Sequence, residues 1–91
     1  MAIVVDVQIA DGNAEQYEKV TSEIGAKKGA VIPGQLVRIA RPANGGWRVT
    51  SVWESQAAFD AFRPKLIAAM QKAGGATTPS IDVSEVYDLA K

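Results

Sequence analysis

The sequence contains no cysteine and no histidine. Without cysteine, neither a disulfide nor a thiolate metal site can form. Without histidine, the chain lacks the side chain that most often serves as a general base and as a ligand to zinc or haem iron. We therefore expect a protein that uses neither a metal nor an organic cofactor.

Net charge is absent as well, because ten basic residues balance ten acidic ones. Nucleic acids and anionic membranes attract proteins through a concentrated positive field, and no basic run is present to create one. No apolar segment approaches the length of a membrane span. The apolar run at residues 2–5 is broken by Asp6 and has no basic leader, which argues against a signal peptide. We expect a cytoplasmic protein that binds neither nucleic acid nor membrane.

The 91 residues, 47% hydrophobic and 22% charged, are typical of one globular domain spanning 1–91. Turn and cap signals divide this domain into six segments. Asn13 and Ser55 are suited to cap helices, and Asn44-Gly45 is suited to a tight hairpin turn. The expected order is a strand at 2–9, a helix after Asn13, strands at 35–41 and 47–54, a helix after Ser55, and a strand at 81–89.

The second helix carries a proline and a terminating signal. Pro64 predicts a kink near residues 60–63, because proline removes a donor and clashes with the preceding turn. Gly74-Gly75 predicts the end of the helix.

The order β-α-β-β-α-β predicts an α+β, ferredoxin-like unit. In that unit, two helices cover one face of a four-stranded antiparallel sheet whose first and third strands are central. The other face is left bare, and a hairpin turning at Asn44-Gly45 places Val37, Ile39 and Val52 on it. A bare apolar face needs a cover, and a second copy of the chain is the simplest one. We expect a homodimer.

The same hairpin register predicts a group of side chains that face the helices. It places Arg38 opposite Ser51 and Leu36 opposite Trp53. A guanidinium, a hydroxyl and an indole would then converge in an apolar pocket, the mixture expected of a small-molecule site. Phe62 and Met70 belong to the apolar stripe of the second helix. We expect the ligand-binding residues to be Trp53, Ser51, Phe62 and Met70.

Each residue that could act in catalysis or ligand binding could instead have a purely structural role. Arg38 could hold a carboxylate or an enolate, or it could form an internal salt bridge. Asp6 could be a general base whose pKa is raised by burial, or it could pair with Arg38 or with an arginine across the dimer. Tyr87 could transfer a proton, or it could be a packing residue. Trp53 could form part of the wall of a ligand pocket, or it could be a core residue.

The element order, the segment from Trp47 to Ser55 and the following Ala58-Phe59-Asp60-Ala61-Phe62 resemble the dimeric α+β barrel superfamily. Within it, the chain is similar to the group around the antibiotic-biosynthesis monooxygenases. The resemblance implies a barrel made of two sheets, one from each subunit, and a small-molecule pocket between the sheet and helices of each subunit. Members include cofactor-independent monooxygenases, haem-degrading enzymes, isomerases and proteins without known catalysis.

The departures from that group narrow the functions that the resemblance implies. Haem-degrading members use a histidine on the second helix and an asparagine on the first strand, and this chain has neither. Cofactor-free oxygenation uses a tryptophan, an arginine, a tyrosine and an asparagine. Trp53 matches the tryptophan loosely, and Arg38 and Tyr87 are possible analogues.

Two functions follow from these considerations. The first is a homodimer that binds a hydrophobic or aromatic metabolite. The alternative is a cofactor-independent monooxygenase, isomerase or cyclase acting on an aromatic or polyketide-like substrate, with Asp6, Arg38 and Tyr87 as its catalytic residues. The enzyme requires an enclosed pocket of roughly 300 Å³ or more beside Trp53, lined by Arg38 or Asp6.

Overall fold

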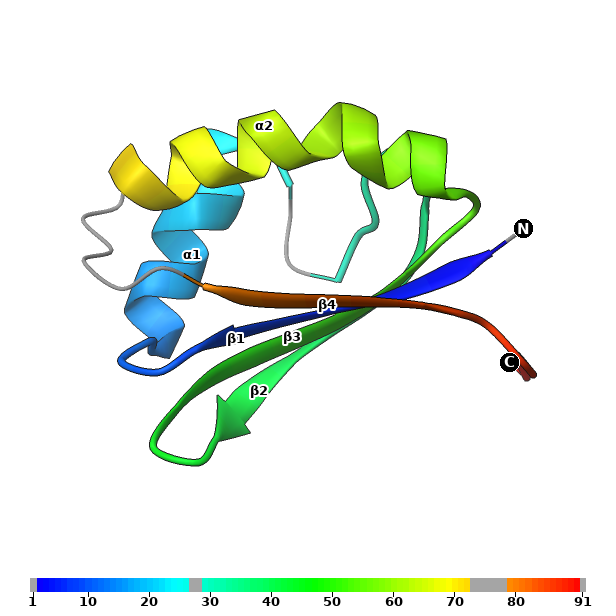
Figure 1. Cartoon of the computed structure of the whole chain (residues 1–91). Helices are drawn as coiled ribbons and strands as arrows, with labels where there is room; N and C mark the ends of the chain where they lie inside the picture. The colour runs from blue at the N-terminus through cyan, green and yellow to red at the C-terminus, as the bar shows by residue number, and fades with distance from the viewer. Residues whose placement is uncertain (1, 27–28, 73–78, 91) are drawn as a thin grey trace.

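The computed structural model describes residues 2–26, 29–72 and 79–90. Gly74-Gly75, expected to end the second helix, lies outside these ranges. The elements are β1 (Ile3–Ile9), α1 (Ala14–Glu23), β2 (Gln35–Ala43), β3 (Gly46–Trp53), α2 (Gln56–Lys72) and β4 (Ser80–Glu85). Their order is the expected β-α-β-β-α-β (Figure 1).

The predicted caps and turn are present. Asn13 Oδ1 accepts a hydrogen bond from the backbone N–H of Gln16 at 2.8 Å, and Ser55 Oγ accepts one from the N–H of Ala58 at 3.1 Å. Both bonds satisfy N–H groups that have no partner within the first turn of a helix. Asn44 and Gly45 have φ angles of 51° and 77°, which confirms the tight turn between β2 and β3.

The four strands form one antiparallel sheet in the order β2-β3-β1-β4. The first and third strands are therefore central, as predicted. Both helices lie on the same side of the sheet, which confirms the ferredoxin-like fold (Figure 1). Along each strand, successive side chains alternate between the helix side and the open side.

The core lies between the sheet and the helices. Val5, Trp53 and Phe59 are almost fully buried and belong to one apolar cluster. A second cluster joins the two helices through Val20 of α1 and Met70 of α2. The first strand thus contributes its odd-numbered residues to the core, and its even-numbered residues, including Asp6, face the open side.

Several details differ from the sequence predictions. The register shifts between Gln35 and Val37, so that Gln35 lies opposite Trp53 and Leu36 does not. A β-bulge of this kind adds one residue to one strand, which moves every preceding side chain to the other face. Strand β4 ends at Glu85, four residues earlier than predicted. Strand β2 ends at Ala43, two residues later than predicted. Helix α2 continues through Pro64, the residue expected to kink it.

The open side of the sheet has the predicted apolar residues. Val37 pairs with Val52 and Ile39 pairs with Thr50, as the hairpin register required. Ile39 is 53% exposed, and no element of the described chain covers it. Among the described residues, no helix is both long and apolar enough to cross a membrane.

Candidate ligand site between the sheet and the helices

A cavity of about 70 Å³ lies between the helix side of the sheet and the two helices. Its walls are mostly apolar and come from β1, β2, β3, α1 and α2. Five of the seven predicted site residues line it: Arg38, Ser51, Trp53, Phe62 and Met70. The other two, Asp6 and Tyr87, do not. The cavity also borders Gln35, Trp47 and Tyr17, to which no binding role was assigned from the sequence.

Trp53 is fixed in this wall by one hydrogen bond and two ring contacts. Its indole Nε1–H donates to Ser51 Oγ at 2.9 Å, and the Ser51 hydroxyl in turn lies 3.4 Å from the carbonyl oxygen of Val5. The rings of Phe59 and Phe62 lie 5.5 and 5.1 Å from that of Trp53. These are favourable aromatic separations. Trp53 is therefore both a core residue and a wall of the cavity.

Arg38 reaches the cavity from β2 and makes contact with a buried amide. Its Nη1–H donates to Gln35 Oε1 at 3.0 Å. Gln35 is only 6% exposed and faces the cavity because of the β-bulge at Leu36. Sequence reasoning placed Leu36 here instead, so the site is more polar at this end than predicted. Arg38 and Gln35 together offer several N–H donors to a bound oxygen atom.

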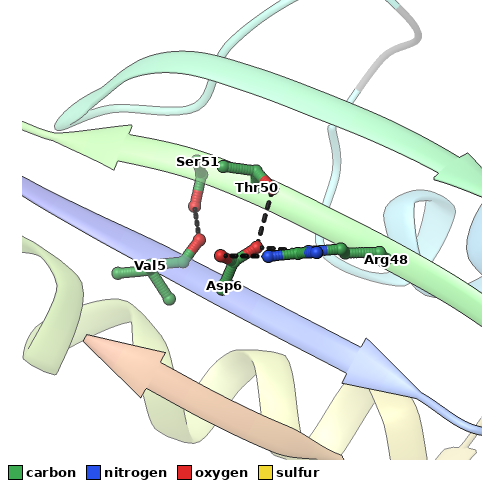
Figure 2. Close-up of polar contacts among 5 residues, drawn as sticks. All are labelled: Val5, Asp6, Arg48, Thr50 and Ser51. Atoms are coloured by element: carbon green, nitrogen blue, oxygen red, sulfur yellow. Dashed lines mark hydrogen bonds and ion pairs between the residues drawn. The ribbon is translucent and has the colours of Figure 1, made fainter. Parts of the chain in front are cut away.

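Asp6 lies on the opposite side of the sheet from this cavity. Figure 2 shows its carboxylate between Arg48 and Thr50 of β3. Arg48 Nε–H and Nη2–H donate to its two oxygens at 2.9 and 2.8 Å, and the Thr50 hydroxyl donates at 2.7 Å. Asp6 therefore forms an ion pair, one of its two predicted roles, but the partner is Arg48 of the same chain.

The Asp6 carboxyl is a poor general base in this environment. The hydrogen bonds from Arg48 lower its pKa from 3.8 to about 2; burial opposes this shift, and the Thr50 hydroxyl adds to it. The sequence-based hypothesis required a pKa raised by burial. The paired guanidinium outweighs desolvation, because charge-assisted bonds stabilise the ionised form.

Tyr87 follows the end of β4 and is fully exposed. It therefore has no contact with the cavity in this structure. Among the described residues that line the cavity, Arg38 and Tyr17 are the titratable ones. No group of three or more carboxylates among the described residues is arranged to hold a metal ion.

No protein-family model matches this sequence, and no curated protein matches it significantly. Solved structures do match the fold. A Caulobacter crescentus protein, provisionally described as an antibiotic biosynthesis monooxygenase, is 24% identical with a TM-score of 0.67, covering 96% of this chain and 91% of its own. A dimeric ferredoxin-like protein of unknown function from Jannaschia is 16% identical with a TM-score of 0.63, covering 94% and 100%.

A third match is a Streptomyces coelicolor monooxygenase whose structure contains the ligand nanaomycin D. It is 20% identical with a TM-score of 0.61, covering 99% of this chain and 90% of its own. At these identities the likeness establishes the fold alone. The chain thus has the ferredoxin-like fold of antibiotic-biosynthesis-monooxygenase-like proteins, as the sequence resemblance implied.

The lowered pKa of Asp6 predicts a specific pH dependence of stability. A group whose pKa is lower in the folded state stabilises the fold above its unfolded pKa, here 3.8, and this contribution is lost as the pH falls toward about 2. The pair is partly exposed to solvent, so we expect Asp6→Asn to lower the free energy of unfolding by on the order of 1 kcal/mol near neutral pH.

This difference from the wild type should shrink between about pH 4 and pH 2 in urea unfolding at a fixed protein concentration. Asp88→Asn, at an exposed position after β4, is the control and should give no such difference. Parallel pH profiles for the wild type and Asp6→Asn would contradict the prediction.

Proposed function

We propose that this protein is a homodimer that binds a hydrophobic or aromatic metabolite between the sheet and helices of each subunit. The observation that carries the proposal is the composition of the cavity wall. Apolar side chains make up most of it. The polar side chains in the wall are Arg38, Gln35 and Ser51 on the sheet and Asn13, Gln16, Tyr17 and Thr21 on the side of α1. Small-molecule sites typically combine an apolar surface with a few such groups.

The polar groups differ in what they can offer to a ligand. The Ser51 hydroxyl is already engaged by Trp53 and Val5, so its role is to hold the indole in place. Arg38 carries a positive charge at the rim of an apolar space. A guanidinium binds a carboxylate or phenolate through charge-assisted hydrogen bonds. The expected ligand is therefore flat and mostly apolar, with an anionic oxygen at one end.

One solved structure of the same fold contains a small molecule, which supports small-molecule binding without fixing the ligand's location or identity. That protein is a monooxygenase crystallised with nanaomycin D, which makes oxygenation of an aromatic substrate the second candidate function. The inner cavity of about 70 Å³ is below the roughly 300 Å³ typical of any small-molecule pocket, so its size does not separate binding from catalysis. One observation weighs against catalysis here: Asp6 and Tyr87, the proposed proton-transfer residues, lie outside the cavity.

The homodimer rests on the open side of the sheet. Ile39 is exposed there beside the Val37–Val52 pair, and the charged groups of Asp6 and Arg48 on the same face neutralise each other. The same face also carries Arg41 and Asp82, so its apolar part around Ile39 is the part suited to burial against a second copy. The Jannaschia relative is itself described as dimeric. Two sheets packed in this way would form the α+β barrel that the resemblance implies.

Substitution of Ile39 tests the dimer. Ile39→Glu would bury an unpaired charge in the dimer, so we expect the dimer dissociation constant to rise by at least about tenfold. Sedimentation velocity at micromolar concentration measures the change. Ala61→Glu adds the same charge at an exposed position of α2 and should leave the dimer intact. A monomeric wild type, or equal behaviour of the two variants, would overturn the proposed interface.

Substitution of two arginines that lie on opposite faces of β2 tests the ligand site. Arg38 lines the cavity. Arg41 is paired with Arg48 of the neighbouring strand and lies on the open side of the sheet. We expect Arg38→Ala to weaken binding of 1-naphthoate by about tenfold, the usual worth of a hydrogen bond to a charged group. Arg41→Ala should bind as the wild type does. Isothermal titration calorimetry measures both constants, and equal affinities of the two variants would remove Arg38 from the site.

A further inference from the structure

A second hollow adjoins the cavity on the side of α1 and β2. It has a volume of about 390 Å³ and is bordered by α1, β2 and residues 29–31. Four residues belong to the walls of both hollows: Tyr17, Thr21, Arg38 and Trp47. The inner cavity alone is small for a metabolite, whereas the second hollow is within the usual range of roughly 300–1,000 Å³ and would allow a ligand to extend into the inner cavity. The four shared residues are thus the part of the protein that a ligand spanning both hollows would contact.

Trp47 is the unusual member of this shared wall, and it also borders a third hollow beside the turn between β2 and β3. Its indole Nε1–H is buried and has no hydrogen-bond acceptor among the described residues. An indole nitrogen can only donate, and buried donors in folded proteins are nearly always paired. The contrast with Trp53 is direct, because the indole of Trp53 donates to Ser51 Oγ at 2.9 Å. The two tryptophans of β3 therefore differ: one N–H is engaged by the protein, and the other is not.

The position of Trp47 is held firmly in spite of this unpaired donor. A Cβ atom added to Gly12 would lie 2.7 Å from Trp47 Cβ, so only glycine allows the turn after β1 to approach so closely. On the other side, the ring of Tyr17 lies 5.8 Å from the indole at an interplanar angle of 38°. Trp47 is thus fixed by backbone packing and by a ring contact, which is how a binding group is preorganised.

We propose that Trp47 is a specificity-determining residue whose indole N–H donates a hydrogen bond to an acceptor oxygen of the bound ligand. This inference rests on the proposed function and adds a second polar requirement to it. The ligand carries a carbonyl or phenolic oxygen within hydrogen-bonding distance of the Trp47 indole, and its apolar part fills the inner cavity beside Trp53. A purely hydrocarbon ligand of the same shape leaves the Trp47 donor unpaired and binds more weakly.

Two neutral bicyclic probes isolate this hydrogen bond. Tetralin and 1-tetralone share one carbon skeleton and differ by a ketone oxygen, so neither interacts with Arg38 as an anion. The chain has two tryptophans, and a ¹⁵N-labelled sample should therefore give two indole N–H signals, assigned with Trp47→Phe. We expect 1-tetralone to shift the Trp47 signal downfield, tetralin to leave it nearly unchanged, and the Trp53 signal to respond similarly to both.

The binding constants give an independent measurement. The ratio of the affinities for 1-tetralone and tetralin should fall by about three- to tenfold in Trp47→Phe, the usual worth of one neutral hydrogen bond. An unchanged ratio together with an unshifted Trp47 signal would overturn the inference while leaving the proposed site standing. If the wild-type protein binds 1-naphthoate but neither probe, the role of Trp47 is overturned and the proposed site stands. If it binds none of the three, both proposals fail.

Discussion

Strand β3 is hydrogen-bonded on both edges, to β1 and to β2, and its side chains alternate between two different environments. Ser51 and Trp53 face the helices, while Arg48 and Thr50 face the open side, where they bind Asp6. A slip of one residue would exchange the two sets and place an ion pair in the core. The positions of the cavity and of the open apolar face both depend on this register.

The hairpin could be predicted from the sequence because its determinants are local. Asn44-Gly45 fixes the turn, and the turn fixes which residues of β2 and β3 are opposite each other. The side of the sheet on which Asp6 lies could also be predicted. Val5 and Val7 on either side of it are core residues, and successive residues of a strand face opposite sides of the sheet. Pairing Asp6 with Arg38 overlooked that alternation.

Other parts of the site depend on contacts that no local pattern records. The β-bulge before Val37 turns Gln35 toward the cavity, and nothing in that segment distinguishes a bulged strand from a regular one. The unpaired N–H of Trp47 is likewise a property of the packed structure, because it depends on which acceptor atoms lie near the indole in the folded chain. The sequence predicted five of the residues that line the cavity, Arg38 among them, but neither Gln35 nor the unpaired donor of Trp47.

We propose different roles for the two sides of the sheet: the helix side binds the ligand, and the open side contacts the second subunit. Methyl labels report on each side directly: Met70 borders the cavity, and Ile39 is exposed on the open face. Intermolecular nuclear Overhauser effects from bound 1-naphthoate should reach the Met70 methyl group and not those of Ile39. Contacts to Ile39 without contacts to Met70 would contradict this division.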